Sequence, residues 1–174
     1  VIQRLHRHRA WVNRNLLDAA TRLSDEQLKA AFPIGQGSIW RSLLHLYGAE
    51  YVWFEALQGN ENSVLPGDAP GSLPGNQLGE GGIADLAELR RKWEQLERRY
   101  TDYMAGLSPG ALDETVARYS LALQARLTPR RSDVLLHVCT HAHYTAAQVV
   151  NMFRQSGADL PQTMLIAMAR QEAV

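Results

Sequence analysis

The chain has 174 residues, with 18 Lys and Arg against 18 Asp and Glu, and a single cysteine, Cys139. This length suits one domain with a core large enough to be stable alone, so we treat residues 1–174 as a single domain. Zero net charge argues against a nucleic-acid partner, because such proteins carry a basic surface. One cysteine excludes an intrachain disulfide and favours a reducing, cytoplasmic location.

The hydropathy of the chain gives no sign of a membrane partner. The N-terminal residues carry arginines and histidines, and no apolar stretch follows them as it would in a signal peptide. No apolar run approaches the roughly 20 residues that a membrane-spanning helix needs. We therefore expect neither secretion nor membrane insertion.

Residues 2–23 place apolar side chains at three- and four-residue intervals, which predicts an amphipathic helix. Ser24 is a natural N-cap for a short helical connector that follows this helix. Two histidines, His6 and His8, lie among arginines near the start of the helix. Because this cluster is so polar, we expect both imidazoles to face solvent.

A second long helix is predicted over residues 39–57, with Ser38 as its N-cap. This helix is apolar almost all round and contains one histidine, His45, which shares a flank with Gly48. A glycine inside a helix costs about 1 kcal/mol relative to alanine. We therefore expect a ligand or another stretch of backbone to approach closely at Gly48.

Residues 59–82 are rich in Gly, Pro, Asn and Ser, which is typical of a loop. Such a long loop inside one domain is uncommon and often functional. We interpret it as a long crossover between helices, because neither flank is large enough to be stable alone. Residues 83–106 then return to a helical period, and the charged face of this third helix is expected to lie in solvent.

Residues 115–126 alternate loosely between apolar and polar side chains, which is consistent with a small hairpin or an extended excursion. The fourth long helix is predicted over residues 132–155, with Ser132 at its start. A short final helix is expected from Pro161 onward. The four long helical patterns, with no convincing sheet, predict an all-α four-helix bundle with a short C-terminal helix.

The fourth helix is apolar around well over half of its circumference and carries one polar stripe. The stripe consists of His137, His141, Tyr144, Thr145, Gln148, Asn151 and Gln155. Histidines four residues apart lie one turn apart and can both reach one ion, and bundles build metal sites between facing helices. With His45, they form a candidate metal site; the alternative is that each is an ordinary hydrogen-bonded histidine. His143 and Cys139 fall on the apolar side, which indicates a packing or surface position for His143 and a packing role for Cys139.

Three stretches that cover most of the chain carry a resemblance to a known family. They read HRHRAWVNRNLLDAATRLSDEQL, SIWRSLLHLYGAEYVWF and LLHVCTHAHYTAAQVVNMFRQSGADLPQT. The chain resembles the DinB/YfiT-like superfamily of metalloenzymes. The resemblance implies a four-helix bundle with up-down-down-up topology, a long second connection and, in many members, a homodimer. It also implies a divalent metal, zinc or nickel, bound by one histidine of the second long helix and two of the fourth.

Matched position by position, His45 takes the place of the family's second-helix ligand and His141 that of the first ligand on the fourth helix. The third ligand lies four residues later in a pattern like HxxxHRGQ, where this chain has Thr145, and only Gln148 survives of the last three residues. A threonine hydroxyl is a poor zinc ligand, so His137 is an alternative third ligand. There are two other possibilities: a carboxylate or the substrate completes the metal site, or the pocket is metal-free.

The resemblance implies a divalent-metal-dependent enzyme of the thiol-S-transferase or hydrolase type with an incomplete or altered histidine site. Its substrate would be a small molecule, such as a low-molecular-weight thiol. The expected metal ligands are His45, His141 and His137. The expected pocket-lining residues are Tyr144, Thr145 and Gln148. The alternative is a non-catalytic, metal-free DinB-like dimer that binds small molecules or serves in stress responses, and neither hypothesis assigns a catalytic residue.

Overall fold

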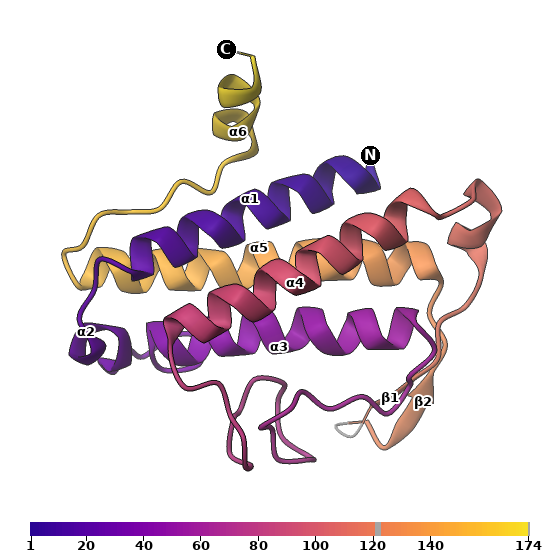
Figure 1. The fold of residues 1–174 in the computed structure, drawn as a ribbon, viewed down its shortest axis with the longest axis horizontal. Coiled ribbons are helices and arrows are strands. Elements are labelled where there is room, and N and C mark those ends of the chain that lie inside the picture. The colour runs from indigo at the N-terminus through magenta and orange to yellow at the C-terminus, as the bar shows by residue number, and fades with distance from the viewer. Residues whose placement is uncertain (121–122, 174) are drawn as a thin grey trace.

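The computed structural model describes residues 1–120 and 123–173, and most of the chain is helical (Figure 1). The four long helices are α1 (Ile2–Ala20), α3 (Ile39–Leu57), α4 (Leu86–Ala105) and α5 (Arg131–Gln155). The short elements are α2 (Asp25–Lys29), the 3-10 helix η1 (Pro109–Asp113), β1 (Arg118–Ser120), β2 (Ala125–Leu127) and α6 (Leu165–Glu172). In the part of the chain that the structure describes, no helix has both the length and the apolar character needed to cross a membrane.

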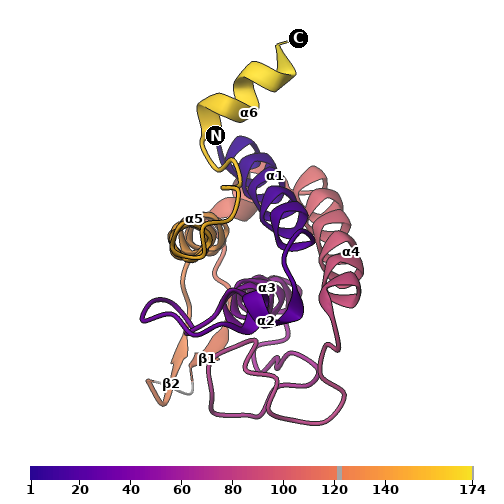
Figure 2. The ribbon, with the colours of Figure 1, turned by 90° about the vertical axis from the view of Figure 1, so that its left-hand side faces the viewer.

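The bundle has the up-down-down-up topology that the resemblance implies. In Figure 1, α1 and α5 run from right to left, whereas α3 and α4 run from left to right. Seen from the end in Figure 2, the helices follow one another around the bundle in the order α1, α5, α3, α4. Because α3 and α4 are parallel, the chain must return along the whole bundle, about 28 Å for a helix of this length, and residues 58–85 provide this connection.

Side-chain caps fix the helix starts in the first half of the chain where the sequence predicts them. Ser24 and Gln27 form a capping box: the Gln27 N–H donates to Ser24 Oγ (3.2 Å) and the Ser24 N–H donates to Gln27 Oε1 (2.9 Å). At α3, Ser38 Oγ accepts the N–H of Arg41 at 3.1 Å. Both predicted starts are confirmed.

The boundaries predicted in the second half are less accurate. α4 starts three residues later than predicted, after Asp85, whose side chain accepts the N–H of Glu88 at 2.8 Å. α5 starts one residue before Ser132, and no side chain caps it. α6 starts four residues after Pro161, because the chain is still extended at Met164 (φ −82°, ψ 131°). The predicted starts are therefore accurate to within one to four residues in this half of the chain.

The segment after η1 is a small hairpin, which decides between the two alternatives left by the sequence. β1 pairs with β2 in antiparallel fashion, and Tyr119 lies opposite Arg126. The backbone N–H of Tyr119 also donates to the carbonyl of Glu61 at 3.0 Å. The side chains of Arg126 and Glu61 form an ion pair of 2.7 Å. These contacts fasten the hairpin to the start of the long connection between α3 and α4.

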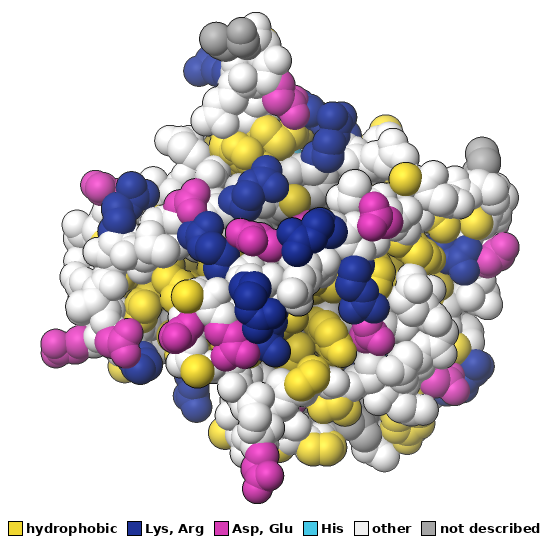
Figure 3. All heavy atoms as spheres, in the orientation of Figure 1, with side chains coloured by type: hydrophobic (Ala, Val, Ile, Leu, Met, Phe, Trp, Pro, Cys, Tyr) yellow, Lys and Arg dark blue, Asp and Glu magenta, His cyan; other side chains and the backbone are white. Residues whose placement is uncertain are grey.

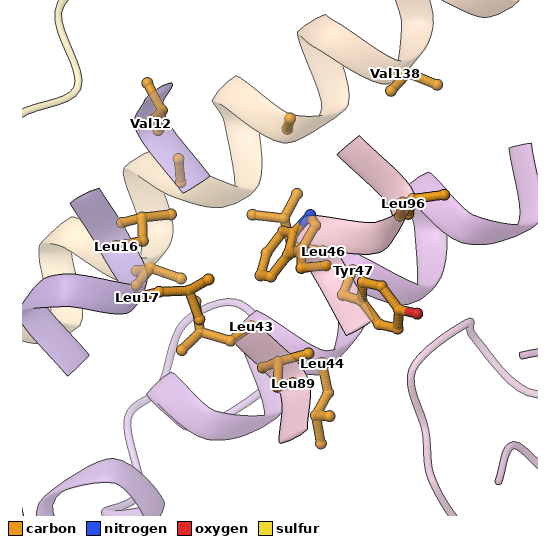
Figure 4. Packing of buried hydrophobic residues seen from close by; sticks show 14 of the residues in the cluster. Val12, Leu16, Leu17, Leu43, Leu44, Leu46, Tyr47, Leu89, Leu96 and Val138 are labelled. Atoms are coloured by element: carbon orange, nitrogen blue, oxygen red, sulfur yellow. The ribbon is translucent and has the colours of Figure 1, made fainter. Parts of the chain in front are cut away.

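The apolar core lies between the four long helices, where leucines from α1, α3 and α4 interdigitate (Figure 4). Leucines that are at most 2% exposed include Leu16, Leu43, Leu46, Leu89 and Leu96. Burying one such side chain stabilises the fold by about 1.5–3 kcal/mol. Leu135 and Val138 of α5 are equally buried, at 0% and 2% exposure, and belong to the same core cluster, so apolar packing also holds α5 against the other helices.

Two histidines of α1 that were predicted to face solvent are buried against α5 and the segment that follows it. His6 and His8 are 1% and 6% exposed. Nε2 of His6 donates to the carbonyl of Leu135 on α5 (3.0 Å), and Nε2 of His8 donates to the carbonyl of Thr163 (2.8 Å). The prediction is wrong because backbone acceptors from other parts of the chain replace water. Burial lowers the pKa of His6 to about 3, so this imidazole is neutral.

A buried ionic network joins three of the four helices. Arg9 of α1, 3% exposed, forms an ion pair with Glu50 of α3 and binds both carboxylate oxygens of Glu97 on α4 at 2.7 and 2.8 Å. Glu50 also accepts hydrogen bonds from Asn13 Nδ2 and Trp93 Nε1, each at 2.9 Å. Burial raises the pKa of Glu50, and the guanidinium of Arg9 opposes this shift. The network fixes the register of α1 against α3 and α4.

Candidate functional site

His45 of α3 and His141 of α5 face each other inside the bundle. Their Nε2 atoms are 3.3 Å apart. Their ring centroids are separated by 5.1 Å, and the ring planes cross at 75°. The structure therefore brings together the two histidines that the resemblance matches to metal ligands of the family.

The protonation of His45 is set by the long connection between α3 and α4. Nδ1 of His45 lies 2.8 Å from the carbonyl oxygen of Pro74. A carbonyl only accepts, so Nδ1 carries the proton and Nε2 presents a lone pair. The contact between the two Nε2 atoms is then a hydrogen bond that His141 donates. Hydrogen bonding of the distal nitrogen to a carbonyl is how proteins orient metal-binding histidines.

Pro74 is held against α3 by a contact between two glycines. A Cβ atom on Gly48 would lie 2.5 Å from the backbone nitrogen of Gly75, and a Cβ on Gly75 (φ +79°) would lie 2.1 Å from the carbonyl oxygen of Leu44. The close backbone approach predicted at Gly48 is confirmed. The carboxylate of Asp68 accepts from the N–H of Gly75 (2.6 Å) and from the backbone and side chain of Gln77 (3.0 and 2.6 Å). The connection is therefore folded on itself at the point where it meets His45.

His137 lies one turn before His141 on α5, and their ring centroids are 5.9 Å apart. Its ring packs edge-on against Trp53 of α3, at 5.2 Å and 70°. Thr145, which the resemblance matches to the family's third ligand, is buried and 2% exposed. Over residues 1–120 and 123–173, no group of three His, Cys, Asp or Glu side chains surrounds one metal position. The structure thus places two imidazoles in contact through their Nε2 atoms and a third imidazole beside them.

The facing pair fits two positions around one metal ion. Zinc–nitrogen bonds of about 2.0–2.1 Å at a tetrahedral angle put two ligand nitrogens about 3.3 Å apart, the separation of the two Nε2 atoms here. Burial, with smaller contributions from His45 and His137, lowers the pKa of His141 to about 4. Burial also lowers the pKa of His137. His141 is therefore neutral near pH 7, which is the form that binds metal.

A cavity of about 670 Å³ lies beside the histidine pair. Its walls come from α3, residues 62–74, β1 and α5. Tyr144, Thr145 and Gln148 do not line it. Tyr144 is 68% exposed, whereas Thr145 faces the core. The helical period places Thr145 on the polar stripe of the fourth helix, but in the structure this side chain packs against neighbouring helices. The long connection and the hairpin form the cavity wall instead.

A larger hollow of about 790 Å³ lies between α1 and α4. Figure 3 shows this side of the molecule, on which basic and acidic side chains are interspersed. The hollow is lined by neither His45 nor His141. The smaller cavity is therefore the candidate site.

The family model for the DinB superfamily matches residues 8–149. The chain belongs to the DinB superfamily. The matched range includes both histidines of the facing pair and Thr145. Comparison with curated proteins gave no match.

The DinB-superfamily bundle is also similar to a solved structure, YfiT from Bacillus subtilis. That protein is described as "a probable metal-dependent hydrolase with an unusual four-helix bundle topology". The alignment has a TM-score of 0.65 and 17% sequence identity, and it covers 91% of this chain and 89% of YfiT. At this identity, the likeness shows a shared fold.

Several residues of the site escaped the sequence reasoning. Pro74 contributes a backbone carbonyl, which any residue type could supply, so its identity carries no signal. The one available clue was Gly48, whose missing side chain admits the connection. Trp53 and Arg118 line the cavity from α3 and β1, and nothing in the spacing of the sequence links the hairpin to the helices.

Proposed function

We propose that this DinB-superfamily protein is a divalent-metal-dependent enzyme of the hydrolase or thiol-S-transferase type. In this proposal His45 and His141 bind zinc or nickel, and His137, which does not share a metal position with them in this structure, leaves Trp53 to become the third protein ligand. The observation that carries it is the pair of Nε2 atoms 3.3 Å apart at the wall of a cavity of about 670 Å³. A bound divalent ion would act as a Lewis acid that lowers the pKa of a bound water or thiol.

The residues of the chain have three roles in this function. His45 presents its Nε2 lone pair because Pro74 takes the Nδ1 proton. His141 is neutral at pH 7 because burial lowers its pKa, and its Nε2 would bind the ion once the Nε2 proton has moved to Nδ1. The cavity, whose size suits a small organic molecule, holds the substrate beside the imidazoles.

Metal analysis of protein purified without a histidine tag tests the proposal. We expect close to one ion per chain in the wild type, and a loss of nearly all metal in His45→Ala and in His141→Ala. His137→Ala should retain metal with lower affinity. His143→Ala is the matched control, because His143 is an exposed histidine of the same helix that does not line the cavity. Sub-stoichiometric metal in the wild type, unchanged in the His45 and His141 variants, would rule out the metalloenzyme.

The second candidate function is a metal-free protein that binds small molecules. The observation that favours it is buried Thr145 at the position of the family's third ligand. In that case, the cavity would still bind small molecules after treatment with a chelator, and metal content would not respond to the histidine substitutions. The same set of variants therefore separates the two functions.

We further propose that the protein acts as a homodimer in a reducing cytoplasm. Support comes from the family resemblance and from Cys139, a free cysteine that is buried and 8% exposed. Light scattering should give twice the chain mass of 19.4 kDa. A mass of one chain at working concentrations would contradict the dimer.

A further inference from the structure

Arg118 of β1 lines the same cavity as His45 and His141. Its Cζ atom lies 5.1 Å from the centroid of the Trp53 ring. Its Nη1 donates to two neutral acceptors, the carbonyl of Val52 at 3.3 Å and the hydroxyl of Ser63 at 3.4 Å. Both distances are at the long end of the range for hydrogen bonds, so the guanidinium is held but weakly satisfied.

Arg118 has no carboxylate partner among the described residues. The other arginine of the hairpin, Arg126, pairs with Glu61 at 2.7 Å. Arg118 makes no such ion pair anywhere in residues 1–120 and 123–173. Burial lowers its pKa, yet a guanidinium stays charged in proteins. A half-buried cation without a counter-ion is costly unless an anion joins it.

The hairpin holds this cation in a fixed place. β1 is paired with β2, with Arg118 opposite Leu127. The next residue, Tyr119, donates its N–H to the carbonyl of Glu61 at 3.0 Å. Stacking on Trp53 restricts the guanidinium further. Little conformational freedom is therefore left to lose when an anion binds, which favours affinity.

The charge and polarity of the cavity define the class of ligand. Arg118 is the only Arg or Lys among the described residues that line it, and one guanidinium matches a monoanion such as a carboxylate. Asp68 also lines the cavity, but its carboxylate accepts hydrogen bonds from Gly75 and Gln77. Much of the remaining wall is apolar: Ala49, Val52, Trp53, Leu65, Pro70 and Leu73.

We propose that Arg118 binds the carboxylate of a largely apolar organic acid, whose other end lies against His45 and His141. The identity of the reacting end rests on the proposed function. The binding of the acid does not, because it needs only Arg118 and the apolar wall. The substrate class of the enzyme is then small organic acids with an apolar body.

Binding of phenylacetate, compared with the neutral phenylacetamide, tests this proposal. Titrations followed by NMR at the Trp53 indole are made on protein stripped of metal with EDTA, so that an ion cannot bind the carboxylate. Charge-assisted hydrogen bonds are worth about 1.5–3 kcal/mol, so we expect the wild type to bind the acid about tenfold or more tightly than the amide. Arg118→Gln should lose this preference while still binding the amide.

Arg126→Gln is the matched control, since it removes one charge from the same hairpin outside the cavity, and it should keep the preference for the acid. Arg118→Lys keeps the charge without the planar fork and should give an intermediate preference; it also serves if the glutamine variant does not fold. Equal binding of acid and amide by the wild type would overturn the proposal. So would no saturable binding of the acid, shifts that avoid Trp53, or an undiminished preference in the Arg118 variants.

These results are independent of the metal analysis. Suppose that the acid preference depends on Arg118 but the metal content is unchanged in the His45 and His141 variants. The acid site would then be supported and the metalloenzyme function refuted. Stoichiometric metal without an acid preference would do the reverse.

Discussion

Replacing Gly48 by alanine tests how the connection controls His45. The added Cβ would lie 2.5 Å from the nitrogen of Gly75 and 2.9 Å from the carbonyl carbon of Pro74. Real Cβ contacts are longer than 3.0 Å, so the connection must move away by about 0.5–0.9 Å to reach an ordinary separation. The hydrogen bond from His45 to Pro74, now 2.8 Å, would then stretch to about 3.3–3.7 Å, at or beyond its limit.

The effect of this substitution on stability should be small, whereas its effect on the site should be large. Overpacking costs about 1–3 kcal/mol, and alanine regains about 1 kcal/mol of helix propensity, so we expect a net loss of about 0–2 kcal/mol. Loss of the outer partner of a metal-binding histidine typically weakens metal affinity by about 10–100-fold. Nitrogen NMR of the His45 ring should show the Nδ1–H tautomer in the wild type and a mixture of tautomers in Gly48→Ala.

Gly106→Ala is the control, because a Cβ there would lie 3.7 Å from its nearest neighbour. It should change neither the tautomer nor the metal affinity. If Gly48→Ala kept both the Nδ1–H tautomer of His45 and the wild-type affinity, the connection would not control the site. The tautomer alone decides this point even if no metal binds.

Four further predictions concern the core and the missing ligand. Thr145→His should tighten zinc binding measured by competition with a chelator, at a cost of about 1–3 kcal/mol because the position is buried; unchanged affinity would show that this position cannot reach the site. Arg9→Met should destabilise the fold by about 3–5 kcal/mol in urea unfolding, because Glu50 loses its buried counter-ion; a loss below 1 kcal/mol would refute the role of the network. The lowered pKa of His6, about 3 against an ordinary 6.5, means that its neutral form stabilises the fold above pH 6.5 and that this stability is lost as the pH falls towards 3. Between pH 6.5 and 4.5, the unfolding free energy of His6→Gln should therefore fall by roughly 2–3 kcal/mol less than that of the wild type, because one pKa unit corresponds to about 1.4 kcal/mol. Leu46→Ala, at a side chain with 0% exposure, should cost about 2–5 kcal/mol by opening a cavity, and calorimetry would measure it.

The sequence predicted the bundle well because its helices are locally encoded. The start of α3 follows from Ser38 and the apolar run behind it, and the capping box at Ser24 marks the connector. The pairing of His45 with His141 was available from the family pattern, because the spacing of ligands along two helices survives as residue identity. Features that depend on residues close together in the sequence could thus be predicted.

The parts that could not be predicted depend on contacts between distant segments. The burial of Arg9 depends on Glu50 and Glu97, which lie 41 and 88 residues away along the chain. Thr145 looks polar on a helical wheel, yet it faces the core. The roles of Pro74 and Arg118 depend on where a loop and a hairpin fold back against the helices. Neither segment has a hydrophobic period from which this position could be predicted.

The segment that forms one wall of the cavity also supplies the carbonyl that orients His45. Mutations that reshape this wall to admit a different substrate would therefore alter the donor strength of the imidazole at the same time. An engineer who wishes to change what the protein accepts should leave Asp68 and residues 74–77 intact and vary the other residues of 62–73 or the hairpin. Selectivity and ion affinity would then become separately adjustable.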